Sequence, residues 1–274
     1  MNNSSIDLLV HNSHHLSSNR ERNTVIVVLN GAVNNRETKA GPFFSGIGIS
    51  NSTNTPLFSF SDPTLELSDK LSIGWYCGYK DRKAIAREIS HILDTFASDN
   101  NVDYFFIGGS AGGFGTLSVL KHLLHSSNAL IWNPQIAIWR YWKAHVGAYL
   151  SCAYNKPITV ENSEHAKMLC DAIGLDSEVH PHDVGNHSIL YCQNESDKHV
   201  QSHMQPFMNQ AKFTKINDST FSFPGNNSFI WIGNWGDGHA PLPVGVVVDS
   251  VHCFKNAGNL SDIRTLVATA LTSN

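Results

Sequence analysis

Continuous apolar runs and amphipathic stretches alternate along the chain. The runs lie at 24–32, 102–110, 128–134, 188–194 and 229–235, and each has a glycine, proline or asparagine among its last three residues. Runs of this length, rich in β-branched and aromatic residues, are typical of strands that are buried on both faces of a sheet. We therefore predict a core strand at each of these positions.

Helices are predicted between several of the runs. The stretch 81–98 repeats its apolar residues at helical spacing, so that one face carries Ile85, Ile89, Ile92, Leu93 and Phe96. An apolar, helix-like segment also follows Ser110, and 260–274 has the pattern of a closing helix. Strands that alternate with helices predict an α/β fold with a mostly parallel central sheet and right-handed crossovers.

Three stretches have weaker patterns. "KLSIGWY" at 70–76 is a further candidate for a core strand, and "PLFSFSDP" at 56–63 is either an edge strand or a loop. Between 136 and 149, aromatic and aliphatic residues recur at roughly helical spacing, as expected for a core helix with an aromatic face. The alternative is that 136–155 is an aromatic-rich excursion over a site, where its side chains line a substrate groove.

A single domain is predicted over 23–274, because the chain has no internal repeat, no low-complexity linker and no break in composition. Residues 1–22 form an N-terminal arm in this prediction. Their asparagine, serine and histidine content suits a disordered arm or a poorly packed first strand. The arm has only Leu8 to Val10 as an apolar patch and no charged region before it, so we do not expect a secretory signal.

Composition excludes several classes of protein. Hydrophobic residues make up 41% of the 274 residues, charged residues 15%, and the formal net charge is −4. Nothing resembles the basic stripe of a nucleic-acid binder, and no apolar run is long enough for a membrane span. The five cysteines are widely spaced without a Cys-x-x-Cys pair, which indicates neither a disulfide framework nor a cysteine zinc site. They favour a reducing, cytoplasmic setting.

Histidine is frequent, with fifteen residues. His180 with His182, and His199 with His203, have spacings that can chelate a metal ion. The second pair lacks the glutamate of a zinc-protease helix, so we expect surface histidines and no metal site.

The glycine cluster "IGGSAGGFG" is the strongest local motif. A phosphate-binding P-loop needs a lysine after the glycines, and a dinucleotide fingerprint needs a different glycine register, so neither fits. Gly108 to Gly112 instead match Gly-x-Ser-x-Gly between a strand and a helix. In that pattern a strained, sharp turn raises the serine hydroxyl above the sheet, and the glycines leave room for it. Ser110 is therefore the candidate nucleophile.

A nucleophilic serine needs a histidine base and an acid that orients the histidine. On this type of sheet the chain order is serine, acid, histidine, each in a loop after a strand. The strand at 188–194 is followed by Glu195 and Asp197, of which Asp197 is preferred. The last strand leads to "WGDGHAPLP" with His239, which is preferred over His252 as the base. Asp237 is predicted to form a turn.

Two main-chain N–H groups are candidates for an oxyanion hole. One belongs to Ala111, directly after the nucleophile, and the other to Ala32, in the loop "LNGA" after the first core strand. The alternative for Ala32 is an ordinary Asn-Gly turn without a catalytic role.

Four short segments, "GGSAGGFGTL", "NPQ", "NESDKH" and "GDGH", resemble the α/β-hydrolase superfamily. They are more similar to a branch from bacterial capsule and surface-polysaccharide biosynthesis, which includes serine-dependent polysaccharide O-acetyltransferases. The resemblance covers most of the chain from Thr24 onward. It implies an α/β-hydrolase fold, which is a three-layer sandwich, and a triad of Ser110, Asp197 and His239.

The resemblance also implies that two loops border the substrate site. They contribute Trp75, Tyr76, Asn133 and Gln135. The same residues are equally consistent with a packed strand end and a strand-terminating turn.

The expected activity is serine-dependent hydrolysis of a short acyl ester, with a carbohydrate as the candidate alcohol and without a cofactor. The alternative is an O-acetyltransferase that uses acetyl-CoA as co-substrate on a bacterial surface polysaccharide, with Arg140, Lys143 and Lys156 as candidates for binding the diphosphate. A non-catalytic protein of polysaccharide assembly is a further alternative.

Overall fold

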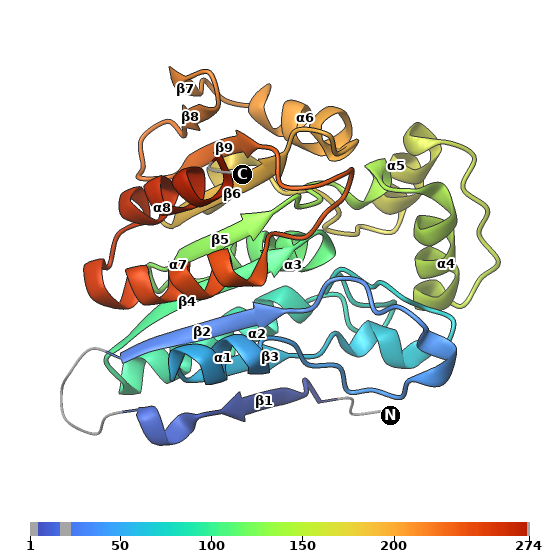
Figure 1. The fold of residues 1–274 in the computed structure, drawn as a ribbon. Helices are drawn as coiled ribbons and strands as arrows, with labels where there is room; N and C mark the ends of the chain where they lie inside the picture. The colour runs from blue at the N-terminus through green and yellow to red at the C-terminus, as the bar shows by residue number, and fades with distance from the viewer. Residues whose placement is uncertain (1–4, 17–22, 273–274) are drawn as a thin grey trace.

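The computed structural model describes residues 5–16 and 23–272. All strands in these ranges belong to one nine-stranded sheet with the order β1-β3-β2-β4-β5-β6-β9-β8-β7 (Figure 1). The six strands from β3 to β9 are parallel, and antiparallel strands flank them at both ends. The strands are β1 (Leu8–His11), β2 (Asn23–Leu29), β3 (Leu57–Phe60), β4 (Val102–Gly109), β5 (Asn128–Trp132), β6 (Ser188–Asn194), β7 (Thr214–Asn217), β8 (Thr220–Ser222) and β9 (Phe229–Gly233).

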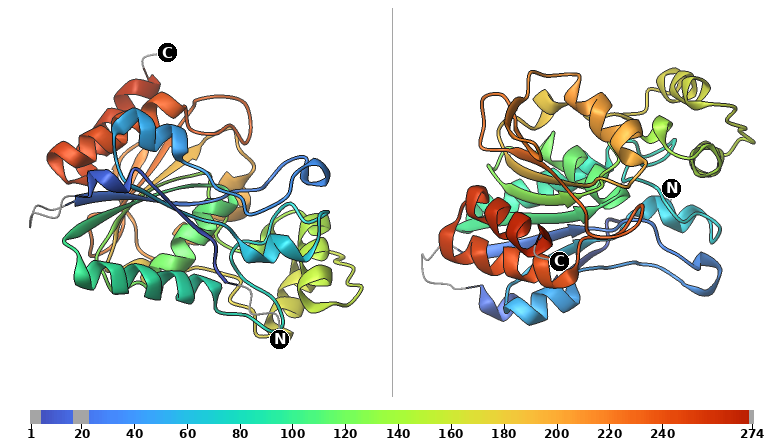
Figure 2. Two further views of the ribbon diagram at one scale, coloured as in Figure 1. Left: turned by 90° about the horizontal axis from the view of Figure 1, so that it is seen from below. Right: turned by 45° about the horizontal axis from the view of Figure 1, so that its top comes forward.

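Helices cover both faces of the sheet (Figure 2). One face carries α2 (Ile85–Asp99) and α3 (Ala111–Leu120), and the other carries α1 (Ile47–Thr53), α7 (Val244–Ala257) and α8 (Leu260–Thr272). Beyond the carboxyl ends of the parallel strands lie α4 (Lys143–Tyr154) and α5 (Ser163–Ala172), while α6 (Gln205–Met208) precedes the β7–β8 hairpin. Within the described ranges, no helix combines the length and the apolar composition that a membrane crossing requires.

Alternate side chains of β2 show how one apolar run builds two cores. Val25, Val27 and Leu29 pack in the cluster that contains α2 and α3, whereas Ile26 and Val28 pack in the cluster that contains α7 and α8. Because successive side chains of a strand point to opposite faces, a strand with helices on both sides is apolar throughout. The prediction of a mostly parallel sheet in a three-layer α/β sandwich is confirmed.

The prediction of a core strand at 70–76 is wrong, because these residues form a buried loop. Trp75 and Tyr76 both have φ of 57°, in the left-handed region. The buried carboxylate of Asp62 accepts a hydrogen bond from the Tyr76 N–H at 2.7 Å, and a Cβ on Gly74 would lie 2.6 Å from that carboxylate. The loop is therefore fixed by a distant acid rather than by its own apolar pattern.

Other elements differ in part from the prediction. Residues 57–60 do form a strand, but β1 pairs with it, so β3 is not at the edge of the sheet. The helix expected from 136 begins only at Lys143, after a short 3₁₀ turn at 138–140. Helix α2 is confirmed, although Ile92 on its predicted apolar face is 36% exposed.

The N-terminal arm contributes an ordered strand. β1 lies within the predicted arm and pairs antiparallel with β3, which matches the alternative of a first strand. The parts of the arm at 1–4 and 17–22 lie outside the described residues. All five cysteines are free, and three of them are buried.

Candidate active site

Ser110 lies in a sharp turn between β4 and α3. Its φ of 53° and ψ of −121° are unfavourable for a residue with a side chain. Three main-chain hydrogen bonds hold this conformation: the Ser110 N–H donates to Trp132 O at 3.0 Å, and Ser110 O accepts from Phe114 and Gln135 N–H groups at 3.2 Å each. Strain of this kind persists only where the surroundings determine it, and it is frequent at functional sites.

Glycines around Ser110 allow the turn to pack closely. A Cβ on Gly108 would lie 2.6 Å from Gly112 O, and a Cβ on Gly112 would collide with Leu29 O in the neighbouring strand. Gly113 and Gly115 face Pro134 and Tyr76 in the same way, with hypothetical Cβ contacts of 2.6 Å each. The glycine pattern is thus explained by contacts with β2, with the loop after β5 and with the 70–76 loop.

Asp197 and His239, from the loops after β6 and β9, meet above the sheet. His239 Nδ1 lies 2.6 Å from Asp197 Oδ2. Because the carboxylate only accepts, Nδ1 carries the hydrogen, and Nε2 is left as an acceptor. The Asp197 side chain is 3% exposed and that of His239 is 42% exposed. The histidine therefore connects a buried acid to a cavity that opens beside Ser110.

Two opposing effects set the pKa of Asp197. Burial acts to raise the pKa, but hydrogen bonds from His239 and from the His199 main-chain N–H, at 3.0 Å, outweigh it. The pKa of Asp197 accordingly lies below its ordinary value, and the group is a carboxylate at neutral pH.

The Ser110 hydroxyl is held by a residue beneath it. Gln135 Nε2 donates to Ser110 Oγ at 3.1 Å, and Gln135 Oε1 accepts from Trp75 Nε1. Gln135 and Trp75 are both buried, so this hydrogen-bonded pair supports the hydroxyl from the protein interior. Within the described residues, Ser110 and His239 do not hydrogen bond, so the Ser110 hydroxyl has to turn toward Nε2 before it can give up its proton, and it can still accept from Gln135. Such contacts are often longer in a free enzyme than in its complexes.

The side chains of Asn133 and Tyr76 both form hydrogen bonds within the protein. The Asn133 side chain donates to Ala240 O at 2.8 Å and accepts from Asn194 N–H at 2.8 Å, so it connects three loops while also lining the cavity. The Tyr76 hydroxyl accepts from Asn30 N–H at 2.6 Å and donates to Phe60 O at 2.9 Å. Of the four residues predicted to border the substrate, only Asn133 lines the cavity.

Asn194 and Ser196 are site residues that the sequence analysis missed. Buried Asn194 donates from Nδ2 to Gly236 O and Gly238 O, both at 2.7 Å. The Ser196 hydroxyl donates to Gly236 O at 2.9 Å and accepts from Gly238 N–H at 3.0 Å. These bonds fix the loop that carries His239 to the loop that carries Asp197. In the sequence, this role is indicated by Asn194 being a polar residue at the end of an apolar strand.

His199 and His203 extend the site into the core. The His199 ring lies edge to face against the His239 ring, with centroids 4.4 Å apart, and contacts His203 at 4.6 Å. Its Nδ1 donates to Asn133 O at 3.1 Å. Burial lowers the pKa of both residues, that of His203 strongly, so both rings are neutral at pH 7. These are core histidines and not the surface residues that we predicted.

Asp197, His199 and His239 have potential metal-binding atoms within 4.8 Å of one another. However, Asp197 and His239 are hydrogen bonded to each other, and His199 Nδ1 is bonded to a carbonyl. A metal ion would have to replace these bonds.

The remaining candidates lie apart from this arrangement. Glu195 is exposed and accepts a hydrogen bond from Asn234 at 2.9 Å, and His252 is exposed on α7. Arg140, Lys143 and Lys156 do not line the cavity, and Arg140 lies 4.2 Å over the Trp139 ring.

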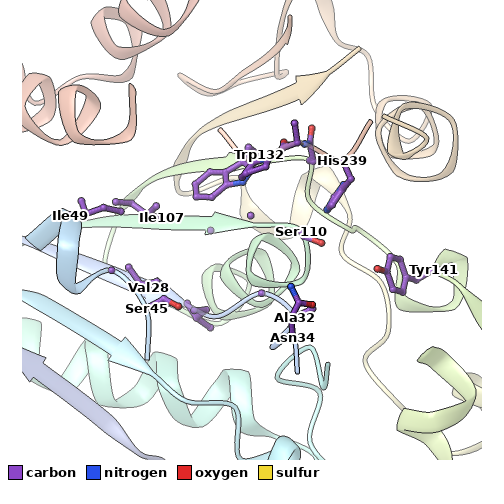
Figure 3. Close-up of a pocket in the computed structure, with 18 residues that line it drawn as sticks. Val28, Ala32, Asn34, Ser45, Ile49, Ile107, Ser110, Trp132, Tyr141 and His239 are labelled. Atoms are coloured by element: carbon purple, nitrogen blue, oxygen red, sulfur yellow. The ribbon is translucent and has the colours of Figure 1, made fainter. Parts of the chain in front are cut away.

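A cavity of about 570 Å³ opens beside Ser110 and is lined by His239, Ala32 and Tyr141 (Figure 3). Figure 3 shows Ala32 on the side of Ser110 away from His239. Within the described ranges, the N–H groups of Ala111 and Ala32 lack a hydrogen-bond acceptor in the protein. They are therefore free to bind an anionic oxygen, and the assignment of an oxyanion hole to them stays a prediction.

The sheet, its helices and the turn at Ser110 define an α/β-hydrolase fold. No protein-family model matches the sequence, and no curated protein matches it. Among solved structures, the capsule O-acetyltransferase of Neisseria meningitidis serogroup A has a TM-score of 0.56 at 13% identity, covering 85% of this chain and 88% of that chain.

Two further structures are similar at the same level. A mutant of that O-acetyltransferase in complex with CoA gives a TM-score of 0.52 at 13% identity, covering 84% of this chain and 85% of that one. AbyA5 gives a TM-score of 0.53 at 12% identity, covering 98% of this chain and 72% of that one. At such identities the likeness establishes the fold, and the α/β-hydrolase resemblance is confirmed at that level.

Proposed function

We propose that the protein hydrolyses carboxylic esters through an acyl-enzyme on Ser110. His239 is the general base and acid, Asp197 orients its imidazole, and the Ala111 and Ala32 N–H groups stabilise the oxyanion. The observation that supports the proposal most directly is the 2.6 Å hydrogen bond from His239 to buried Asp197, at the rim of the cavity that the strained Ser110 turn also lines. This bond leaves Nε2 free to take a proton.

The reaction has two balanced steps. Ser110 Oγ attacks the ester carbonyl carbon while its proton moves to His239 Nε2, and the C–O bond to the alcohol breaks as His239 protonates the alcohol oxygen. Water then attacks the Ser110 ester and gives a proton to His239. Ser110 recovers this proton when its bond to the acyl carbon breaks, and the carboxylic acid leaves.

A second candidate is an acetyl-CoA-dependent O-acetyltransferase of a bacterial surface polysaccharide. Two observations favour it: the fold is similar to a capsule O-acetyltransferase, and a mutant of that protein was solved with CoA. In this reaction a sugar hydroxyl replaces water as the group that attacks the acyl-enzyme. The cytoplasmic location expected from the cysteines stays a prediction and belongs with this candidate.

Hydrolysis of p-nitrophenyl esters tests the proposal. Ser110→Ala, His239→Gln and Asp197→Asn are each expected to lower kcat/KM by about 10³-fold or more. Normal hydrolysis by Ser110→Ala would exclude the serine mechanism, whereas no hydrolysis by the folded wild type would leave the non-catalytic assembly protein as the better hypothesis. Adding acetyl-CoA and a glycan acceptor distinguishes transfer from hydrolysis, because only a transferase gives an acetylated glycan.

A further inference from the structure

Apolar side chains close one end of the cavity that contains Ser110. Val28 and Ile107 come from paired positions on β2 and β4, Ile49 comes from α1, and Trp132 comes from the end of β5. Figure 3 shows Val28, Ile49 and Ile107 together at the end of the cavity opposite Tyr141, with Ser110 and His239 between the two ends. We call these four side chains the apolar end.

Two glycines shape the apolar end. Gly46 precedes α1 with φ of 93°, and a Cβ there would lie 2.8 Å from Val28 Cγ2. Gly109 faces the Trp132 indole, which would collide with any Cβ at that position. The absence of both side chains lets α1 and the indole lie close to the sheet. These two elements then form walls of the apolar end.

The chemistry distinguishes the two ends of the cavity. His239 must protonate the departing alcohol, so the alcohol has to leave on the side of His239. The acyl group therefore extends to the other side of Ser110, where the walls are apolar. The polar groups of Tyr141, Asn34 and His239 lie away from the apolar end, where Ser45, beside Val28, contributes a hydroxyl (Figure 3).

We infer that the apolar end binds a medium-length acyl chain rather than acetyl, an inference that rests on the proposed ester hydrolysis. Ile107 is three positions before Ser110, which is about 10 Å along a strand and matches an extended chain of about eight carbon atoms. The preferred substrate is then an ester of an acid with about six to eight carbons, longer than the short acyl group expected from the sequence.

The energetic consequence is a dependence of rate on chain length. Each methylene that is buried against these walls raises kcat/KM by about fourfold, the equivalent of about 0.8 kcal/mol. Hexanoate has four more methylenes than acetate, so their full burial raises kcat/KM by about 250-fold, and the increase ends when the chain reaches Ile49 and Ile107.

The experiment measures kcat/KM for p-nitrophenyl esters from two to twelve carbons with the wild type, Ile49→Trp and Ile47→Trp. Ile47 lies on the same short helix but is 41% exposed and outside the cavity, so its variant is the matched control. Ile49→Trp is expected to remove the gain from acetate to hexanoate, whereas Ile47→Trp keeps the wild-type profile. If Ile49→Trp does not fold, Ser45→Phe narrows the apolar end from the side of Val28.

An isomeric pair of substrates tests the direction of the chain. Ethyl hexanoate and hexyl acetate contain the same atoms, but only the first has the long chain on the acyl side. A preference for ethyl hexanoate by at least tenfold supports the inference, and a preference for hexyl acetate overturns it. Equal use of acetate and hexanoate esters, or an equal loss on all esters in Ile49→Trp, also overturns it. Ester hydrolysis that persists in Ser110→Ala would instead contradict the proposed function.

Discussion

Ser110 adopts its conformation because both sides of the turn are constrained. Its main-chain N–H and C=O are bonded to Trp132, Phe114 and Gln135, and its neighbours at 108 and 112 have no space for a side chain. The strain is therefore compensated by many weak interactions rather than by one. A side chain at position 108 or 112 should therefore lower both the stability of the fold and the rate of the reaction.

Gly108→Ala tests this constraint. The new Cβ would lie 2.6 Å from Gly112 O and 2.7 Å from Thr116 Oγ1, and a main-chain oxygen cannot move aside. We expect the free energy of unfolding to fall by about 1–3 kcal/mol and ester hydrolysis to fall with it. Chemical denaturation measures the first effect.

Gly245→Ala is the matched control. Gly245 lies in α7, and a Cβ there would meet nothing within 4 Å. Its stability should stay unchanged or rise by up to about 1 kcal/mol. Equal losses of stability in Gly108→Ala and Gly245→Ala would contradict the role of close packing at the Ser110 turn.

The loops after β6 and β9 act as one unit. The loop of Asp197 and the loop of His239 come from adjacent parallel strands, and Asn194 joins them at the carboxyl ends of those strands. The position of His239 thus depends on a side chain that does not line the cavity.

Asn194→Ala removes the hydrogen bonds to Gly236 and Gly238. We expect a loss of about 1–3 kcal/mol in the free energy of unfolding, because buried polar interactions are lost. We also expect kcat to fall more than KM rises, since the bonds hold His239 and not the substrate. Asp237→Ala, at an exposed position in the same loop, should alter stability by less than about 0.5 kcal/mol. A similar kcat in both variants would contradict this account of the loop.

At the scale of the whole molecule, buried neutral histidines make stability depend on pH. Burial, together with His199, Arg140 and His239 nearby, holds the pKa of His203 well below its ordinary value. Below pH 6.5 the unfolded chain binds a proton at this position and the folded chain does not. Stability therefore falls as pH falls.

His203→Gln tests this linkage while keeping an acceptor for the Ile136 N–H, which His203 Nδ1 binds at 3.3 Å. Between pH 6.5 and 5 the wild type should lose up to about 1.4 kcal/mol per pH unit for each such histidine, and the variant should lose less. Denaturation curves at several pH values measure the slope. The same slope in both proteins would contradict the role of His203.

Local sequence patterns predicted the elements whose conformation depends mainly on residues close together in the chain. The buried strands and α2 follow from apolar periodicity, and the turn at Ser110 follows from the spacing of its glycines. The loop at 70–76 could not be predicted, because its conformation depends on Asp62 and its apolar residues are equally suited to a strand. The pairing of Gln135 with Trp75 beneath Ser110, and the packing of His199 on His239, likewise arise only from tertiary contacts.

The central claim is that Ser110 is the nucleophile of an ester-cleaving enzyme. A fluorophosphonate probe measures it most directly, because the probe forms a covalent bond only with an activated serine. We expect the wild type to be labelled once, with the adduct on the peptide that contains Ser110, and Ser110→Ala to remain unlabelled. Equal labelling of both proteins, or no labelling of the folded wild type, would contradict the claim.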